Sequence, residues 1–511
     1  MSYNSTLILL PVAAFFILML GIGFYIQKKS ADAKAANFSK EYFIGGRSLG
    51  GFVLAMTLVA TYSSVSSFMS GPGTAWDRGY GWVYYASTQV VAAFIVLGVL
   101  GKKMAVVGRK VDAVTVIDII RARYHSELLA NFCALVIVVF FTTTMLGQFI
   151  GGAQIFASVT GLDYKLGLLI FAVVVVVYTT VGGFNAVAIT DTICAMVMVV
   201  GMCLLAGVII IKGGGLANIT AHIAQVSADA KASGVGHEML SPYAEVAGIA
   251  TLPIQLYITQ WMLCGFTTLG LPQSNVRCLA YKDTKSVHQA MIYGTIVVGA
   301  MMVGMHLIGV LSRGVLTTLP EGASTDAVIP TVIVEYMHPL IAGLVIIGPL
   351  AATMSTISSL LIAGSSAIVK DMYLHHKEVK NEEPDQKFVG KISIAVTGLM
   401  GIAAILLAIY PPDIIVWINM FSFGGLQTVF FWTLLFGMFW KKANKEGATA
   451  AAIGGLAVYC ITMALKIKLS TFHNIILGVG SALILFIIFN NFGKAIDEKT
   501  GRTFFPETYD D

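Results

Sequence analysis

Charged residues are scarce in this sequence. Asp, Glu, Lys and Arg make up 12% of its 511 residues, hydrophobic residues make up 57%, and the mean hydropathy is +0.82. Soluble domains carry about 25% charged residues, so the composition excludes an ordinary water-soluble domain. Apolar runs of about 18 residues or more recur along the chain, and each could cross a bilayer as a helix. We therefore predict an all-α integral membrane protein that crosses the lipid bilayer many times.

Cysteine and catalytic motifs are also sparse. The six cysteines are scattered without a CxxC pair, which argues against a disulfide framework or a thiolate metal site. We find no P-loop, zinc-ligand spacing, nucleophile elbow or kinase motif, and no cluster of His, Asp and Glu remains for catalysis. The net charge of +5 is not a signal of nucleic-acid binding. We therefore expect neither an enzyme nor a nucleic-acid partner.

About thirteen segments have the length and hydropathy of transmembrane helices. Their expected ranges are 6–26, 50–71, 80–101, 127–157, 166–183, 187–211, 248–270, 286–312, 339–366, 389–409, 414–440, 447–465 and 471–491. We interpret residues 1–511 as one transmembrane domain. The polar segment 212–247 is expected to be the longest external loop, and 492–511 to be a poorly ordered cytoplasmic tail.

Lys and Arg are distributed unevenly between alternate connecting segments. If the N-terminus is outside, most of the 32 Lys and Arg residues fall on the cytoplasmic side. The positive-inside rule therefore places the N-terminus outside and the C-terminus in the cytoplasm, in the inner (cytoplasmic) membrane.

The second expected span carries an unusual concentration of hydroxyl groups at its centre. Its hydroxyl side chains are Thr61, Tyr62, Ser63, Ser64, Ser66, Ser67 and Ser70, and Gly71-Pro72-Gly73 then interrupts the helix. Each hydroxyl could simply bond the carbonyl one turn back. As a group, however, polar residues in a helix interrupted by Gly and Pro indicate the binding site of a transporter.

A second interrupted span follows five spans later. Segment 248–270 contains Pro253, and it runs into Gly265–Pro272. Two broken helices in corresponding positions are typical of two five-helix units with inverted topology and a site between them. We therefore expect an inverted-repeat core over 50–440, with one extra helix before it and two after it.

The span 339–366 contains another hydroxyl cluster. Ser355, Ser358 and Ser359 share one helical face, with Thr356 beside it. Small hard cations such as Na+ take oxygen ligands, including hydroxyls and the carbonyls that a broken helix frees. The alternative is close helix packing through small residues.

Three isolated polar residues lie within expected spans. Asp191 is a candidate ion ligand, although it could instead cap the helix that begins near Val187. Gln89 could bind a substrate or a neighbouring helix. His306 is interpreted as a packing residue.

At these residues the chain resembles the sodium:solute symporter family over about residues 41–447. The stretches that carry the resemblance are Tyr42–Gly50, Tyr178–Phe184 leading to Asp191, Ala351–Thr356 and Lys370–Tyr373. The resemblance implies a LeuT-like fold with Na+ as the coupling ion. It implies a sodium site formed by the carbonyls of Ala60, Ser63 and Ala352 and the hydroxyls of Ser355 and Thr356. Some members hold a second sodium ion, and the matching residues here are Asp191, Ser358 and Ser359.

Within this family, stretches such as Gly270-Leu271-Pro272 and Gly304–Leu307 favour Na+-coupled import of a small organic anion by alternating access, with pantothenate as the expected substrate. Sugar is not expected, because Thr267, Thr268 and Val90 stand where sugar-transporting relatives have aromatic gates and an acidic ligand. No Lys or Arg is expected near the centre, so backbone N–H groups at the broken helices would receive the carboxylate. The expected substrate contacts are Tyr62, Ser64, Ser67, Gln89, Thr267 and Thr268. The alternatives are proline or another carboxylate, or a membrane sensor built on a transporter fold.

Overall fold

The computed structural model describes residues 3–32, 38–234, 236–241, 252–410, 415–467, 469 and 472–508. Throughout these residues the secondary structure is helical, and the only β feature is an isolated bridge between Leu49 and Tyr281. The prediction of an all-α fold is confirmed. Residues 248–251, 414 and 471, at the edges of expected spans, lie outside the described part.

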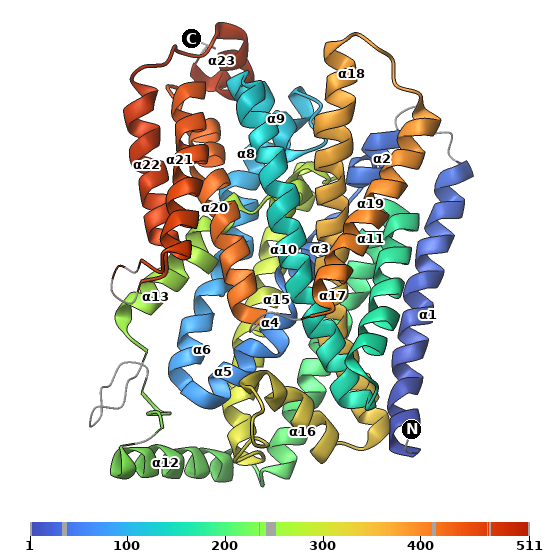
Figure 1. Cartoon of the computed structure of the whole chain (residues 1–511), viewed down its shortest axis with the longest axis vertical. Helices are drawn as coiled ribbons and strands as arrows, with labels where there is room; N and C mark the ends of the chain where they lie inside the picture. The colour runs from blue at the N-terminus through green and yellow to red at the C-terminus, as the bar shows by residue number, and fades with distance from the viewer. Residues whose placement is uncertain are drawn as a thin grey trace.

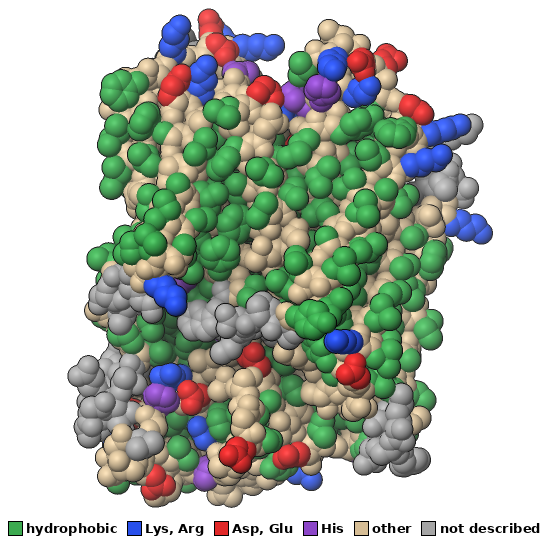
Figure 2. Space-filling view, viewed as in Figure 1, with side chains coloured by type: hydrophobic (Ala, Val, Ile, Leu, Met, Phe, Trp, Pro, Cys, Tyr) green, Lys and Arg blue, Asp and Glu red, His purple; other side chains and the backbone are tan. Residues whose placement is uncertain are grey.

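Nine helical segments of the described chain are long and apolar enough to cross a membrane. They are α1 (Tyr3–Asp32), the run Tyr80–Lys110, α10 (Glu127–Thr160), α11 (Tyr164–Lys212), α15 (Thr284–Leu311), α17 (Pro339–Ser366) with its extension to Val379, α19 (Gln386–Ala408), α20 (Ile415–Phe439) and α21 (Lys445–Ala464). Figure 1 shows most of them running along the long axis of the molecule. Hydrophobic side chains cover its broad middle, and most charged side chains gather at its two ends (Figure 2). This distribution is that of a multi-pass membrane protein.

One further span is broken. α3 (Gly51–Tyr62) and the helical run Val65–Arg78 meet at an angle of 80° across a two-residue gap. The run Val65–Arg78 comprises α4 (Val65–Phe68) and α5 (Ser70–Arg78). The break falls within the hydroxyl cluster. The sequence predicted that the helix stops at Gly71-Pro72-Gly73, and this is wrong, because α5 begins at Ser70 and these residues form its first turn. Serine and threonine can bond nearby backbone groups outside a helix, which offsets the loss of the helical ladder.

The boundary predicted near 183–187 coincides with a kink. α11 consists of two helices that meet at Gly183, whose φ of +61° is not helical. The segment expected at 248–270 is described from Leu252, and it consists of short pieces, namely α13 (Ile254–Gln260), a π-helical turn (Trp261–Gly265) and a 3-10 turn (Phe266–Gly270). They lead into α14 (Pro272–Asn275) and the 3-10 turn Val276–Leu279.

Short helices lie at the two ends of the molecule. α12 (Leu216–Ser233), in the expected external loop, lies across the end near which α1 begins, whereas α9 (Val116–Tyr124) and α23 (Glu498–Phe504) lie at the opposite end (Figure 1). The expectation of a poorly ordered tail is wrong for α23. Phe504 and Phe505 are buried, and their rings lie 5.8 and 5.5 Å from the guanidinium of Arg123. Cation–π contacts and apolar burial hold this segment in place.

The centre of the molecule is α17. Every side chain from Val345 to Ser366 is buried, and the helix packs against α1, α3, α10 and α11. The hydroxyl groups of α17 therefore face other helices and not lipid, where an unpaired polar group would be costly.

Candidate functional site

The break between α3 and α4 frees backbone oxygens in the protein interior. Ser63 and Ser64 have extended backbone conformations, with φ/ψ of −75°/130° and −133°/176°. The amide of Gln148 on α10 accepts a hydrogen bond from the N–H of Val65 at 3.0 Å and so supports the start of α4. Because the helix stops at Tyr62, the carbonyls of the last turn of α3 are available to other partners.

Hydroxyls of α17 meet these freed carbonyls. Ser355 Oγ lies 3.0 Å from the carbonyl oxygen of Ala60 and 3.2 Å from that of Ala352. Thr356 Oγ1 lies 2.9 Å from the carbonyl oxygens of both Ser63 and Ala352. All five oxygens of the predicted sodium site are therefore drawn together by contacts between α3 and α17.

The chemistry of this oxygen cluster fits a small hard cation. Its members are uncharged hydroxyls and carbonyls, and the five residues are buried. Ser63 adds a buried hydroxyl oxygen with no hydrogen-bond partner within the described chain. Buried oxygens of this kind normally have a partner, and a bound cation would supply one.

Asp191 of α11 contacts α17 one helical turn beyond the predicted sodium ligand Ser355. Its carboxylate oxygens are 3.5 Å from Ser358 Oγ and 3.4 Å from Ser359 Oγ, and Thr57 Oγ1 donates to it at 2.6 Å. The structure thus brings together all three residues predicted to hold a second sodium ion. That site stays a prediction.

The expectation that no Lys or Arg lies near the centre is wrong. Arg277 is 2% exposed, and its guanidinium lies 3.3 Å from the Asp191 carboxylate and donates to Ser359 Oγ at 2.6 Å. Its place in the sequence, close to Lys282 and Lys285, indicated a solvated loop. A buried carboxylate, however, needs a charge partner or a metal, and this need was the signal in the sequence that an arginine had to turn inward.

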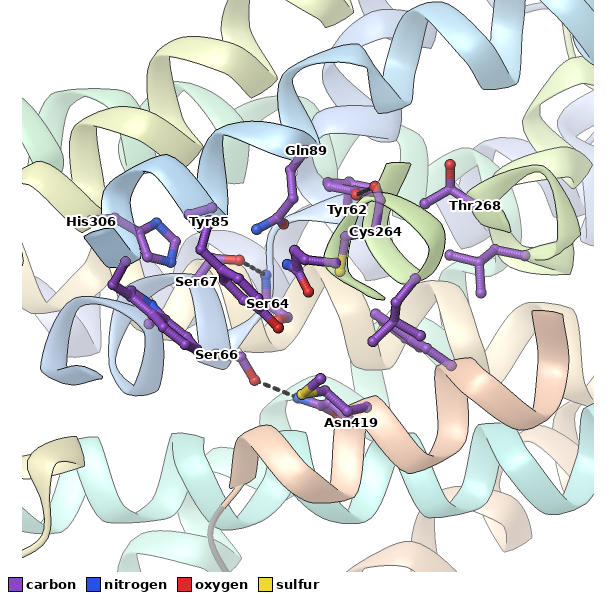
Figure 3. Close-up of a pocket in the computed structure, with 18 residues that line it drawn as sticks. Tyr62, Ser64, Ser66, Ser67, Tyr85, Gln89, Cys264, Thr268, His306 and Asn419 are labelled. Atoms are coloured by element: carbon purple, nitrogen blue, oxygen red, sulfur yellow. Dashed lines mark hydrogen bonds between the residues drawn. The ribbon is translucent and has the colours of Figure 1, made fainter. Parts of the chain in front are cut away.

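The cavity next to the helix break contains most of the predicted substrate contacts. Tyr62, Ser64, Ser67, Gln89 and Thr268 all line it. Figure 3 shows Gln89 and Asn419 reaching toward it from helices on opposite sides. Thr267 is turned away, because its buried hydroxyl bonds Gln427 Oε1 on α20 at 2.7 Å.

Several further lining residues were missed from the sequence. The cavity wall also includes Trp82, Tyr85, Cys264, His306 and Asn419. Asn419 Nδ2 donates to Ser66 Oγ at 2.6 Å, as drawn in Figure 3. These residues come from elements distant in sequence, so only the isolated polar character of His306 and Asn419 within apolar spans could have indicated them. The lining contains no Asp, Glu, Lys or Arg.

The model of the sodium:solute symporter family matches residues 42–455. The chain belongs to the sodium:solute symporter family. This membership confirms the resemblance inferred from the sequence motifs, and it makes Na+ the coupling ion of a transporter.

Relatives within the symporter family include transporters with different substrates. The chain is 39% identical over 501 residues to the sodium/pantothenate symporter of Escherichia coli strain K12, covering 97% of this chain and 99% of that protein. It is equally similar, at 39% over 498 residues, to the sodium/pantothenate symporter of Haemophilus influenzae. An osmoregulated proline transporter of Bacillus subtilis is 29% identical over 508 residues.

Solved structures show the same fold. A Na+-coupled sialic acid symporter in a substrate-bound, outward-open state superposes with a TM-score of 0.78 at 22% identity, covering 97% of this chain and 99% of that one. A nucleobase-cation-symport-1 family transporter superposes with a TM-score of 0.56 at 15% identity, covering 90% and 97% of the two chains. The symporter therefore has the LeuT-like fold predicted from the sequence.

Proposed function

We propose that this symporter couples the inward movement of Na+ to the import of pantothenate by alternating access. The full-length relatives at 39% identity are sodium/pantothenate symporters, whereas the proline transporter is similar at 29%. Pantothenate is a small organic anion, as the sequence led us to expect.

The coupling mechanism is supported by the position of the proposed sodium ligands next to the cavity-lining residues. The proposed sodium ligands Ala60 and Ser63 alternate along the same helix break with the cavity-lining residues Tyr62 and Ser64. An ion that holds the two carbonyls fixes the backbone conformation that orients the neighbouring substrate contacts. Sodium would therefore lower the ordering cost of binding substrate, and substrate would favour sodium by the same factor.

We propose that the cavity holds the anion through uncharged donors. Tyr62 is already engaged, because its hydroxyl donates to the Cys264 carbonyl at 2.7 Å. The Gln89 side chain, in contrast, makes no hydrogen bond to the described residues and is available to a ligand. Backbone N–H groups at the broken helices, the Ser64 and Ser67 hydroxyls and Thr268 complete the proposed contacts, while Thr267 would act through Gln427.

The alternatives keep the same fold. Proline or another carboxylate would be carried by the same mechanism, whereas a sensor on a transporter fold would bind substrate without accumulating it.

Uptake by the purified protein in liposomes distinguishes these alternatives. We expect an inward Na+ gradient to drive uptake of labelled pantothenate that excess unlabelled pantothenate, but not proline, inhibits. A K+ gradient of equal size is the control, and uptake that ignores Na+ would contradict the proposal.

We also propose thirteen spans, with a five-plus-five inverted repeat over 50–440 in a single domain. Counting α11 as two spans across its kink, and adding the broken segment after Pro253 and the shorter apolar helix α22 (Ile475–Asn490), supports this number. An odd number of spans agrees with the start of α1 and α23 lying at opposite ends (Figure 1). We place the N-terminus outside and the C-terminus in the cytoplasm, in the inner membrane, where labelling of single introduced cysteines with an impermeant reagent would check it.

A second sodium ion at Asp191, Ser358 and Ser359 is part of the proposal. The hydroxyl of each serine lies within 3.5 Å of a carboxylate oxygen of Asp191. Arg277 already offsets the charge of Asp191, so the second site rests on its oxygen geometry.

A further inference from the structure

His306 on α15 presents a free hydrogen-bond acceptor to the cavity. Its side chain is 4% exposed, and its Nδ1 lies 2.6 Å from the carbonyl oxygen of Met302. A carbonyl can only accept a hydrogen bond, so Nδ1 carries the proton. In a neutral imidazole, Nε2 is then an acceptor.

The surroundings favour the neutral form. No Asp or Glu lines the cavity, and a buried imidazolium without a charge partner is strongly disfavoured. Within the described chain, the His306 side chain makes one hydrogen bond, from Nδ1 to the Met302 carbonyl, so Nε2 has no protein partner there.

A glycine leaves room for the His306 imidazole. A Cβ built on Gly71 would lie 2.3 Å from His306 Nε2, so any side chain there would displace the imidazole. Gly71 and His306 line the cavity together. Close packing also holds α15 in place, since a Cβ on Gly309 would meet the Pro72 carbonyl oxygen at 2.1 Å.

Two other polar side chains in the cavity wall, Asn419 and Tyr62, are already paired. Asn419 donates to Ser66 and accepts from Gln148, and the Tyr62 hydroxyl donates to the Cys264 carbonyl. The groups left for a ligand include the His306 acceptor, the Gln89 amide and the indole N–H of Trp82, which is buried without a partner in the described chain. Figure 3 shows His306 and Gln89 entering the cavity from neighbouring helices. This uncharged set suits a hydroxyl and an amide, not a second charged group.

We propose that His306 Nε2 accepts a hydrogen bond from a hydroxyl of the substrate and so selects hydroxylated acids over acids of similar shape that lack the hydroxyl. The inference rests on the proposed function, because pantothenate carries hydroxyls and an amide besides its carboxylate. A site built around a hydrogen bond rejects a ligand without the matching group, since its own polar atom is then left unpaired. Proline has no hydroxyl to place there.

The test crosses two ligands with three proteins. The ligands are pantothenate and its analogue with both hydroxyls replaced by hydrogen, and each competes with labelled pantothenate in liposomes under a fixed Na+ gradient. The proteins are the wild type, His306→Leu, which removes the acceptor, and His306→Gln, which retains one. His288→Leu, an exposed histidine on the same helix, is the matched control.

We expect the wild type and His288→Leu to prefer pantothenate over the analogue by about tenfold. In His306→Leu this preference should fall to about onefold, because the affinity for pantothenate falls while the affinity for the analogue does not. His306→Gln should restore part of the preference. An unchanged preference in His306→Leu would overturn this inference alone. A wild type that recognises neither compound would overturn the proposed function and this inference with it. Na+-dependent thermal stabilisation of His306→Leu shows that the variant is folded.

Discussion

A single hydroxyl group cannot satisfy all the carbonyls that surround it at the break in α3. Ser355 Oγ lies within 3.2 Å of three carbonyl oxygens, those of Ala60, Ala351 and Ala352, but it has one proton to donate. The carbonyl of Ala60, which the helix break frees, therefore competes for this one proton with two carbonyls of α17. A cation relieves this arrangement, so the crowding of acceptors is itself an argument for the sodium site.

Removing one ligand should therefore weaken sodium binding. We expect Ser355→Ala or Thr356→Ala to raise the Na+ concentration that half-saturates uptake by roughly tenfold or more, because losing an oxygen ligand of the ion is comparable to losing a hydrogen bond to a charged group, about 1.5–3 kcal/mol. Na+ titration of uptake at saturating pantothenate measures the shift. Ser366→Ala is the control, since among the described residues its hydroxyl bonds Ala363 on its own helix and no sodium ligand. Unchanged Na+ dependence in both ligand variants would count against the site.

Gln89 should act on the substrate and not on the ion. Its amide lines the cavity and makes no hydrogen bond to the described residues, and it is absent from the sodium cluster. We expect Gln89→Ala to weaken pantothenate binding by about fivefold to tenfold while shifting Na+ affinity less. Thermal-shift titrations with each ligand compare the two effects in one variant. Intact substrate affinity would remove Gln89 from the site.

Among the helices, the pair Asp191–Arg277 ties α11 to the segment that follows α14. Both side chains are almost fully buried, so each needs the other's charge. Losing one partner of a buried pair costs about 3–5 kcal/mol, whereas replacing both can be nearly neutral. We expect Asp191→Asn and Arg277→Gln each to lower the thermal unfolding midpoint in detergent, and the double variant to recover much of the loss. Additive losses would show that the pair is not coupled.

The same elements show how far sequence reasoning reaches. Hydropathy predicted the long helices, and the Ser/Thr clusters located the break in α3 and the facing hydroxyls of α17, because these signals are local. The inward turn of Arg277 and the presence of His306 and Trp82 in one cavity depend on packing between distant segments. No single stretch encodes such contacts. Gly183 lies in the boundary predicted from the sequence, and the two helices of α11 meet there at a kink, because glycine readily adopts a positive φ.

For the whole molecule, the number of sodium ions per cycle decides how strongly the membrane potential drives uptake. One Na+ carried with a monovalent anion moves no net charge, while two Na+ move one positive charge. Each net charge is worth about 2.3 kcal/mol per 100 mV, or about fiftyfold in the accumulation ratio. The proposed second site therefore predicts that uptake depends on the membrane potential.

With two ions, uptake of pantothenate should be electrogenic and show a Na+ Hill coefficient above about one. Ser358→Ala should lower that coefficient, and it is the cleaner probe because Ser358 Oγ contacts Asp191 and the Ser355 carbonyl, whereas Ser359 also bonds Arg277. Asp191→Asn should lower it too, but that variant also disturbs the pair with Arg277. The measurement is uptake in liposomes clamped at a series of K+/valinomycin potentials under one Na+ gradient. If uptake ignores the potential, Arg277 already supplies the cation that Asp191 requires, and the carboxylate and its neighbouring serines join the helices without binding a second ion.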